Sequence, residues 1–145
     1  MFKGKILVTG APLSPSTIMA LSKADYKVGM AWDCQGQVRE ISNAGYNMVI
    51  VNEIDEISEE PAIPGAQICG QIRQASDAPI IIISRDKDPH TLANAIAAGA
   101  DYFLREPLHP VELVARIDAL LRRHREIANY MPLQYQQQTV LSLAL

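Results

Sequence analysis

Five short apolar runs, separated by longer amphipathic segments, set the hydrophobic pattern of the chain. Each run is rich in β-branched residues and bounded by polar ones, which is typical of strands buried on both faces of a parallel sheet. The predicted strands are Lys5–Thr9, Tyr26–Trp32, Met48–Val51, Pro79–Ser84 and Asp101–Leu104. We expect Met48–Val51 to be the central strand, which would deliver Asn52 to the carboxyl edge of the sheet, where ligands gather in open α/β folds.

A helix is predicted after each strand. Ser14-Pro15 and Asp88-Pro89 each combine an N-cap residue with a proline suited to the first helical position. The predicted helices are Pro15–Ala24, Asp33–Asn43, Gly65–Ala75, Asp88–Ala98 and Pro110–Arg125. Regular alternation with short connections implies right-handed crossovers and an α/β, doubly wound (βα)5 parallel sheet in a three-layer sandwich.

Composition narrows the class of protein. With 145 residues, 48% of them apolar, the chain suits one globular domain. The net charge of −3 provides no field that attracts nucleic acid, and no apolar run is long enough to span a bilayer. Cys34 and Cys69 lie far apart in the sequence, so we expect reduced thiols and a cytoplasmic location.

The densest group of carboxylates follows the central strand, in the segment Glu53–Glu60. It lacks the alternating acids and central glycine of a calcium loop, so we interpret it as a solvated loop. The three histidines share no ligand spacing. We therefore expect neither a metal nor a cofactor.

The last third of the chain carries a family resemblance. The segment Gly99–Arg123, GADYFLREPLHPVELVARIDALLRR, resembles the fifth strand and last helix of response-regulator receiver domains. PIIIIS resembles the fourth strand of that family and KILVTGAP the first. The likeness extends over roughly residues 3–123, and the family has the flavodoxin-like strand order that the alternation favours.

The resemblance implies where the family's chemistry would lie. Receiver domains transfer a phosphoryl group to an aspartate with the help of magnesium, an acid pair, a hydroxyl, a lysine and an aromatic switch residue. These functions fall, in chain order, on Gly10 and Ala11 (acid pair), Asn52 (acceptor), Ser84 (hydroxyl), Phe103 (switch) and Glu106 (lysine). Only Ser84 keeps the family's chemistry, and its hydroxyl has either a switching role or a simple hydrogen bond to the neighbouring loop.

The substitutions agree with one another physically. Without the acid pair and the acceptor, the pocket lacks the oxygens and the charge that hold a divalent cation. A glutamate in place of the lysine would repel a phosphoryl group by about 4 kcal/mol, for unit charges about 4 Å apart at an effective dielectric of about 20. We therefore interpret the chain as a pseudo-receiver with a vacated phosphorylation pocket and no enzymatic activity, working through protein–protein contact.

The predicted boundaries and partners follow from this interpretation. Residues 1–125 would form the receiver-like domain and residues 126–145 a tail or linker, whose apolar end is Thr139–Leu145. By family analogy, the fourth helix, fifth strand and fifth helix form the face for a protein partner or a homodimer, and the tail is a second candidate. We expect no membrane contact and no direct nucleic-acid binding. Two alternatives stay open: a conventional phosphorelay regulator lacking its output domain, and a flavodoxin-like cofactor-binding protein.

Overall fold

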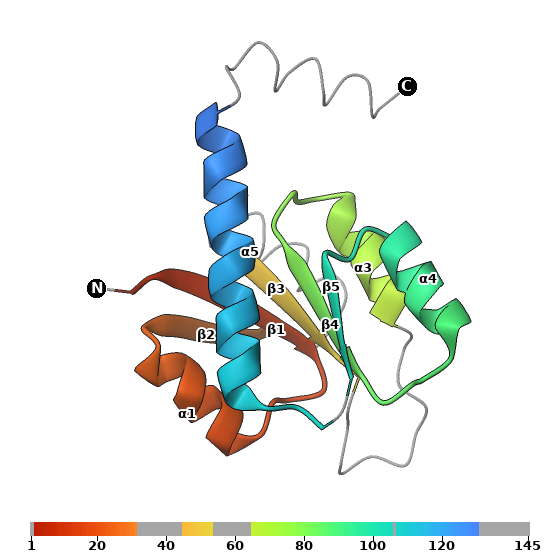
Figure 1. Cartoon of the computed structure of the whole chain (residues 1–145), viewed down its shortest axis with the longest axis horizontal. Coiled ribbons are helices and arrows are strands. Elements are labelled where there is room, and N and C mark those ends of the chain that lie inside the picture. The colour runs from red at the N-terminus through yellow and green to blue at the C-terminus, as the bar shows by residue number, and fades with distance from the viewer. Residues whose placement is uncertain (1, 32–44, 54–64, 106, 131–145) are drawn as a thin grey trace.

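The computed structural model describes residues 2–31, 45–53, 65–105 and 107–130 and contains one five-stranded parallel sheet (Figure 1). The strands are β1 (Gly4–Gly10), β2 (Tyr26–Ala31), β3 (Met48–Asn52), β4 (Ile80–Ser84) and β5 (Tyr102–Arg105). Their order is β2-β1-β3-β4-β5, so β3 is the central strand, as predicted. All four pairings are parallel, which brings the carboxyl ends of the strands to one edge of the sheet.

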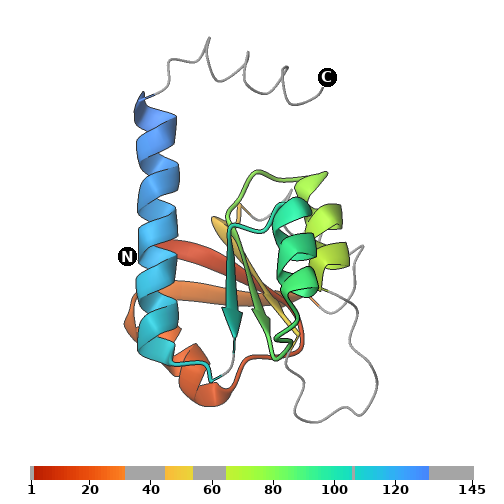
Figure 2. The same cartoon turned by 45° about the vertical axis from the view of Figure 1, so that its right-hand side comes forward.

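Helices cover both faces of this sheet. The described helices are α1 (Pro15–Lys23), α3 (Gly65–Arg73), α4 (Pro89–Ala97) and α5 (Pro110–Tyr130). Helices α1 and α5 lie on one face, and α3 and α4 lie on the other (Figures 1 and 2). The predicted caps are present, since Ser14 accepts a hydrogen bond from the N–H of Thr17 and Asp88 from that of His90. The predicted flavodoxin-like, three-layer α/β fold is confirmed.

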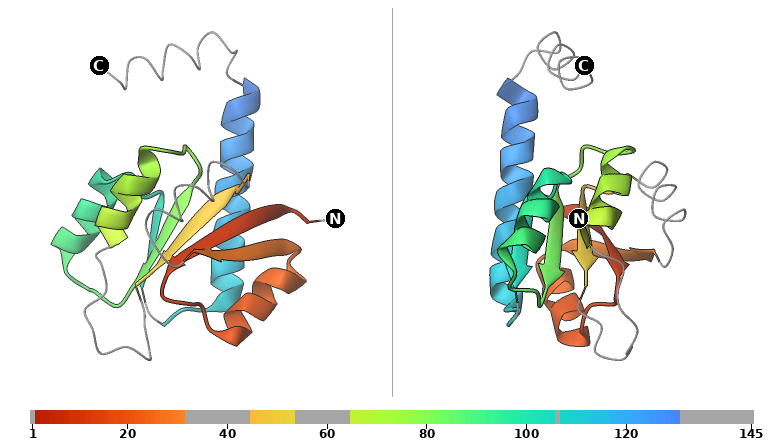
Figure 3. Two further views of the ribbon diagram at one scale, coloured as in Figure 1. Left: turned by 180° about the vertical axis from the view of Figure 1, so that it is seen from behind. Right: turned by 90° about the vertical axis from the view of Figure 1, so that its right-hand side faces the viewer.

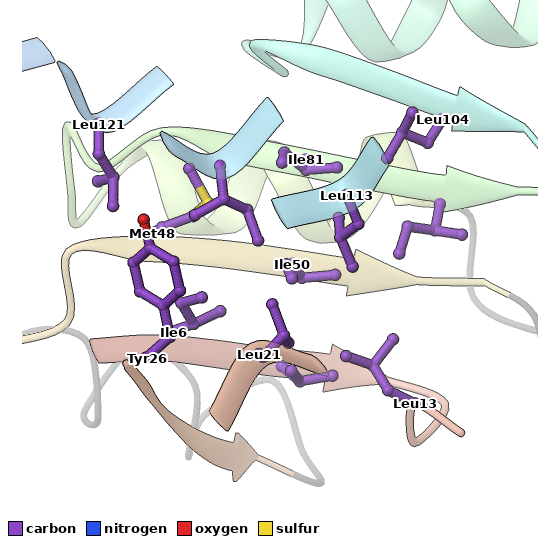
Figure 4. Packing of buried hydrophobic residues seen from close by; sticks show 13 residues of the cluster. Ile6, Leu13, Leu21, Tyr26, Met48, Ile50, Ile81, Leu104, Leu113 and Leu121 are labelled. Atoms are coloured by element: carbon purple, nitrogen blue, oxygen red, sulfur yellow. The ribbon is translucent and has the colours of Figure 1, made fainter. Parts of the chain in front are cut away.

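Alternate residues of each strand feed two separate hydrophobic layers. Ile6, Ile50 and Ile81 belong to the layer under α1 and α5, which Figure 4 shows. Leu7, Val49 and Ile82 belong to the layer under α3 and α4. Strands β3 and β4 are buried along their whole length, because each has a neighbouring strand on both sides and a helical layer on both faces.

The predicted end of the last helix is wrong. Helix α5 does not end at Arg125 but continues to Tyr130, and its last turns project beyond the sheet (Figure 3). Residues 126–130 contain neither glycine nor proline, so the backbone continues as a helix beyond Leu121, the last core residue of α5 among those whose burial the structure describes. The domain boundary predicted at 125/126 lies within this helix and stays a prediction. The predicted helix Asp33–Asn43, most of the acidic loop, Glu106 and residues 131–145 of the tail lie outside the described residues.

Candidate functional site

Asn52 ends the central strand and ties the segment after β1 to it. The side chain is almost fully buried, with 5% of the residue exposed. Its nitrogen Nδ2 donates to the carbonyl oxygens of Ala11 and Pro12, both at 3.2 Å. The N–H of Ala11 in turn donates to the carbonyl oxygen of Asn52 at 2.8 Å. The predicted acceptor position therefore holds a hydrogen-bond donor that faces backbone oxygens.

Gly10 lies beside Asn52 in the β1–β3 register and has a conformation that favours glycine, with φ of +83°. A β-carbon at this position would lie less than 3.0 Å from the backbone carbonyl oxygen of Asn52. The backbone thus leaves no room for a side chain here. An aspartate at position 10 would require a different path of the chain, not only a different residue.

Ser84 is the last residue of β4, the strand next to β3, and it is also buried. Its Oγ accepts a hydrogen bond from the N–H of Asp86 at 3.1 Å, which is the bond to the neighbouring loop that the sequence offered as one alternative. The loop repeats this pattern, because Asp86 accepts from the N–H of Asp88 and Asp88 from the N–H of His90, both at 2.9 Å. These contacts order the connection to α4.

The switch position, Phe103, faces away from Asn52 and Gly10. Its partly buried ring packs against the hydrophobic layer under α3 and α4. The guanidinium carbon of Arg105, two residues on, lies 5.9 Å from the centre of this ring. The structure therefore brings Gly10, Ala11 and Asn52 together, and places Ser84 one strand away and Phe103 in the other layer.

Glu53 has a role that the sequence analysis missed. We assigned it to a solvated acidic loop, but its Oε1 accepts a hydrogen bond from the N–H of Gly65, the first residue of α3. A β-carbon at position 65 would lie less than 3.0 Å from this carboxylate oxygen. The carboxylate compensates one of the unpaired N–H groups and the positive dipole at the helix start. A glycine that opens a predicted helix was the only signal for this contact.

Arg73 is a second residue that sequence reasoning missed, and it lies at the opposite, amino edge of the sheet. Its guanidinium pairs with the carboxylate of Asp101 at 2.6 Å and donates to the carbonyl oxygens of Ser76, Ala78 and Gly99. Asp101 also accepts the N–H of Ile80 at 2.8 Å. This hub joins α3, β4 and β5 far from Asn52, so we interpret it as structural.

A magnesium ion, which receiver chemistry uses, does not fit the residues at positions 10, 11 and 52. Glycine and alanine provide no side-chain oxygen, and the amide nitrogen of Asn52 donates to the carbonyl oxygens of Ala11 and Pro12. Within the described residues, no three side chains of the metal-ligating types form a group that could hold an ion.

Comparisons with known proteins agree with the fold. A family model described as the response regulator receiver domain matches residues 16–118. The response regulator ArlR of Staphylococcus aureus is 32% identical over 105 residues, which cover 72% of this chain and 46% of ArlR. The chain thus spans about half the length of this curated relative.

Solved structures share the fold of this chain. A two-component response regulator from Clostridium difficile superposes with a TM-score of 0.68 at 23% identity, covering 84% of this chain and 98% of that one. A CheY-like receiver domain protein from Methanospirillum hungatei JF-1 gives a TM-score of 0.70 at 17% identity, covering 85% of this chain and 97% of that one.

Among the described helices, none has the length and apolar character needed to cross a membrane. The family model and the curated relative together show that this chain belongs to the response regulator receiver domain family of two-component signalling.

Proposed function

We propose that this chain is a pseudo-receiver, a receiver domain that signals without being phosphorylated. The observation that carries the proposal is the pair of hydrogen bonds from the Asn52 side chain to the carbonyl oxygens of Ala11 and Pro12. A carboxylate has no hydrogen to donate and would face two oxygens there. The Asn52 side chain instead joins β3 to the segment after β1.

Two further features support the same function. The conformation of Gly10 excludes a side chain at the first acid position. The hydroxyl of Ser84 is bound by the N–H of Asp86. Neither feature depends on Glu106, which lies outside the described residues.

The direct test uses acetyl phosphate or beryllofluoride with magnesium. We expect intact-mass analysis to detect no phosphoryl adduct, and we expect amide NMR spectra to be unchanged by beryllofluoride. The variant Asn52→Asp should also stay unmodified, because the acid pair is still missing. A conventional receiver domain treated in parallel serves as the positive control. A stable adduct on the wild-type chain would contradict the proposal and favour the conventional phosphorelay alternative.

The proposed output is contact with a protein partner in the cytoplasm, or with a second copy, through α4, β5 and α5. Helix α4 carries no aspartate, glutamate, lysine or arginine, and Ile96 on it is 60% exposed. On β5, the ring of Tyr102 is stacked by the guanidinium of Arg116 from α5, 4.5 Å from the ring centre. Because Arg116 has this internal contact, Ile96 is a cleaner position for testing the surface.

The variant Ile96→Asp should weaken self-association or partner binding by placing a charge in an apolar contact. Met19→Asp is the matched control, since Met19 is 58% exposed and lies on α1, across the sheet from α4. Light scattering over a concentration series reports the mass of the particle for both variants. If both associate as the wild type does, deletion of residues 134–145 tests the tail, the other candidate surface.

A further inference from the structure

Asp86 lies at the centre of the polar contacts between β4 and α4. Its Oδ1 accepts the N–H of Asp88 at 2.9 Å, and its Oδ2 accepts the hydroxyl of Thr91 at 2.7 Å. Its own N–H donates to the Oγ of Ser84 at 3.1 Å. One residue therefore connects the end of β4 with the first turn of α4.

A cation from the neighbouring strand completes this environment. Arg105 ends β5 and is paired in register with Ser84. The hydrogen bonds from Asp88 and Thr91, together with the positive charge of Arg105, hold the pKa of Asp86 below its usual range. A backbone N–H and a hydroxyl are groups with which proteins bind small anions. In this protein the carboxylate of Asp86 accepts hydrogen bonds from both of these groups.

We propose that Asp86 is a built-in anion that fixes the connection between β4 and α4, and with it the first turn of α4, without any bound phosphoryl group. The contacts involve none of the residues at positions 10, 11 and 52, so this inference does not rest on the proposed function. Its consequence is that the orientation of α4, and thus of Ile96, is set by the chain itself. The surface of α4 is then presented in one arrangement in the unmodified protein.

Two variants separate the charge of Asp86 from its shape. Asp86→Ala removes both oxygens, whereas Asp86→Asn keeps one acceptor oxygen and nearly the same shape but removes the charge. Asp77→Ala is the charge-matched control, because Asp77 is an exposed aspartate in the connection between α3 and β4, at the other edge of the sheet. Thr91→Val removes one donor with a side chain of the same shape.

The readout is amide hydrogen exchange at Thr91 and Leu92. Both N–H groups donate to the carbonyl oxygen of Asp88, so neither loses its own acceptor in the Asp86 variants. We expect exchange at these two amides to accelerate about tenfold in Asp86→Ala and to a lesser extent in Asp86→Asn, as loss of a charge-assisted hydrogen bond implies. The control Asp77→Ala should exchange as the wild type does.

Exchange at Ile81 and Ile83 shows whether each variant is folded. If Asp86→Ala does not fold, Thr91→Val gives the same test at Leu92, where faster exchange is expected. Wild-type exchange at Thr91 and Leu92 in both folded Asp86 variants would overturn the proposal. Wild-type exchange in Asp86→Asn alone would also overturn it, because an acceptor oxygen rather than an anion would then be sufficient.

Discussion

Asn52 binds both backbone polar groups of Ala11. The carbonyl oxygen of Asn52 accepts the N–H of Ala11 at 2.8 Å, and its Nδ2 donates to the carbonyl oxygen of Ala11 at 3.2 Å. Because the second bond needs a donor, only an amide among side chains of this size satisfies the arrangement. The side chain at the predicted acceptor position therefore makes contacts that an aspartate would disrupt.

The first prediction concerns Asn52→Asp. At pH 7 we expect a loss of about 1–3 kcal/mol in the free energy of unfolding, because a buried carboxylate would face two carbonyl oxygens without a donor. The loss should shrink as the pH falls toward about 4, the ordinary pKa of an aspartate, because a protonated acid can again donate. The sign follows from linkage: a carboxyl group whose folded-state pKa is raised destabilises the fold increasingly as the pH rises.

Urea unfolding at pH 4 and pH 7 measures this effect. Asn47→Asp is the matched control, since Oδ1 of Asn47 accepts the N–H of Lys5 at 2.8 Å and an aspartate can do the same. Equal stability losses in the two variants would contradict the role that we assign to the amide of Asn52.

The second prediction compares two glycines. Gly10→Ala should destabilise the protein by more than about 1–2 kcal/mol, because the positive φ and the overlap with the carbonyl oxygen of Asn52 both oppose a β-carbon. Gly70→Ala should stabilise it by about 0.5–1 kcal/mol, since Gly70 lies within α3 and a β-carbon there would have no atom within 4 Å. Thermal unfolding of both variants tests the opposite signs, and two shifts of the same sign would show that the assignment is wrong.

The third prediction concerns the strand beside the central one. Ile81 and Ile83 are fully buried, as their positions in the apolar run predict. Replacing either with alanine should lower the free energy of unfolding by about 2–5 kcal/mol through lost burial and an unfilled cavity. Ile96→Ala on the exposed side of α4 is the control and should change stability by less than about 0.5 kcal/mol. A loss below about 1 kcal/mol at both core positions would not be compatible with β4 as an interior strand of the sheet.

Sequence patterns predicted the elements that depend on local regularity. The run Ile80–Ile83 has no polar residue, so burial on both faces follows directly from the composition of the strand. The caps Ser14 and Asp88 act over two or three residues, so they could also be predicted from the sequence. The end of α5 could not be predicted in this way. The amphipathic pattern ends at Arg125, but nothing in the sequence stops the helix before Tyr130.

The contacts of the candidate site depend on chain geometry that no local pattern encodes. The family resemblance assigned Asn52, Gly10 and Ala11 to one pocket, but it did not predict that the backbone after β1 points two carbonyl oxygens at the amide. Glu53 and Gly65 meet although they are twelve positions apart in the sequence, and Arg73 reaches Asp101 across twenty-eight positions. Such pairs become visible only once the strands are arranged in space.

The fourth prediction concerns pH and Asp86. Its pKa lies below the ordinary value of 3.8, mainly because of the hydrogen bond from the N–H of Asp88 and then that from Thr91. An acid with a lowered folded-state pKa contributes stability that is present above the unfolded pKa and disappears as the pH falls through the folded one. The wild type should therefore be more stable than Asp86→Asn at pH 7, with the difference vanishing in strong acid. Carboxyl chemical shifts followed from pH 7 to pH 2 measure the pKa directly, and a value at or above 3.8 would contradict the assignment.

The fifth prediction concerns Thr9, the residue before Gly10. Thr9 is fully buried, and its hydroxyl has no hydrogen-bond partner among the residues that the structure describes. An unsatisfied buried hydroxyl is costly, so replacement by valine, which has the same shape, should raise the free energy of unfolding by about 1 kcal/mol. Thr17→Val provides the opposite control, because Thr17 is also buried but its Oγ1 lies 2.8 Å from the Oγ of Ser14 in a hydrogen bond that valine cannot make. Urea unfolding should therefore give a gain for position 9 and a loss for position 17. A loss at position 9 would mean that the hydroxyl of Thr9 is satisfied in solution, by water or by a part of the chain outside the described residues.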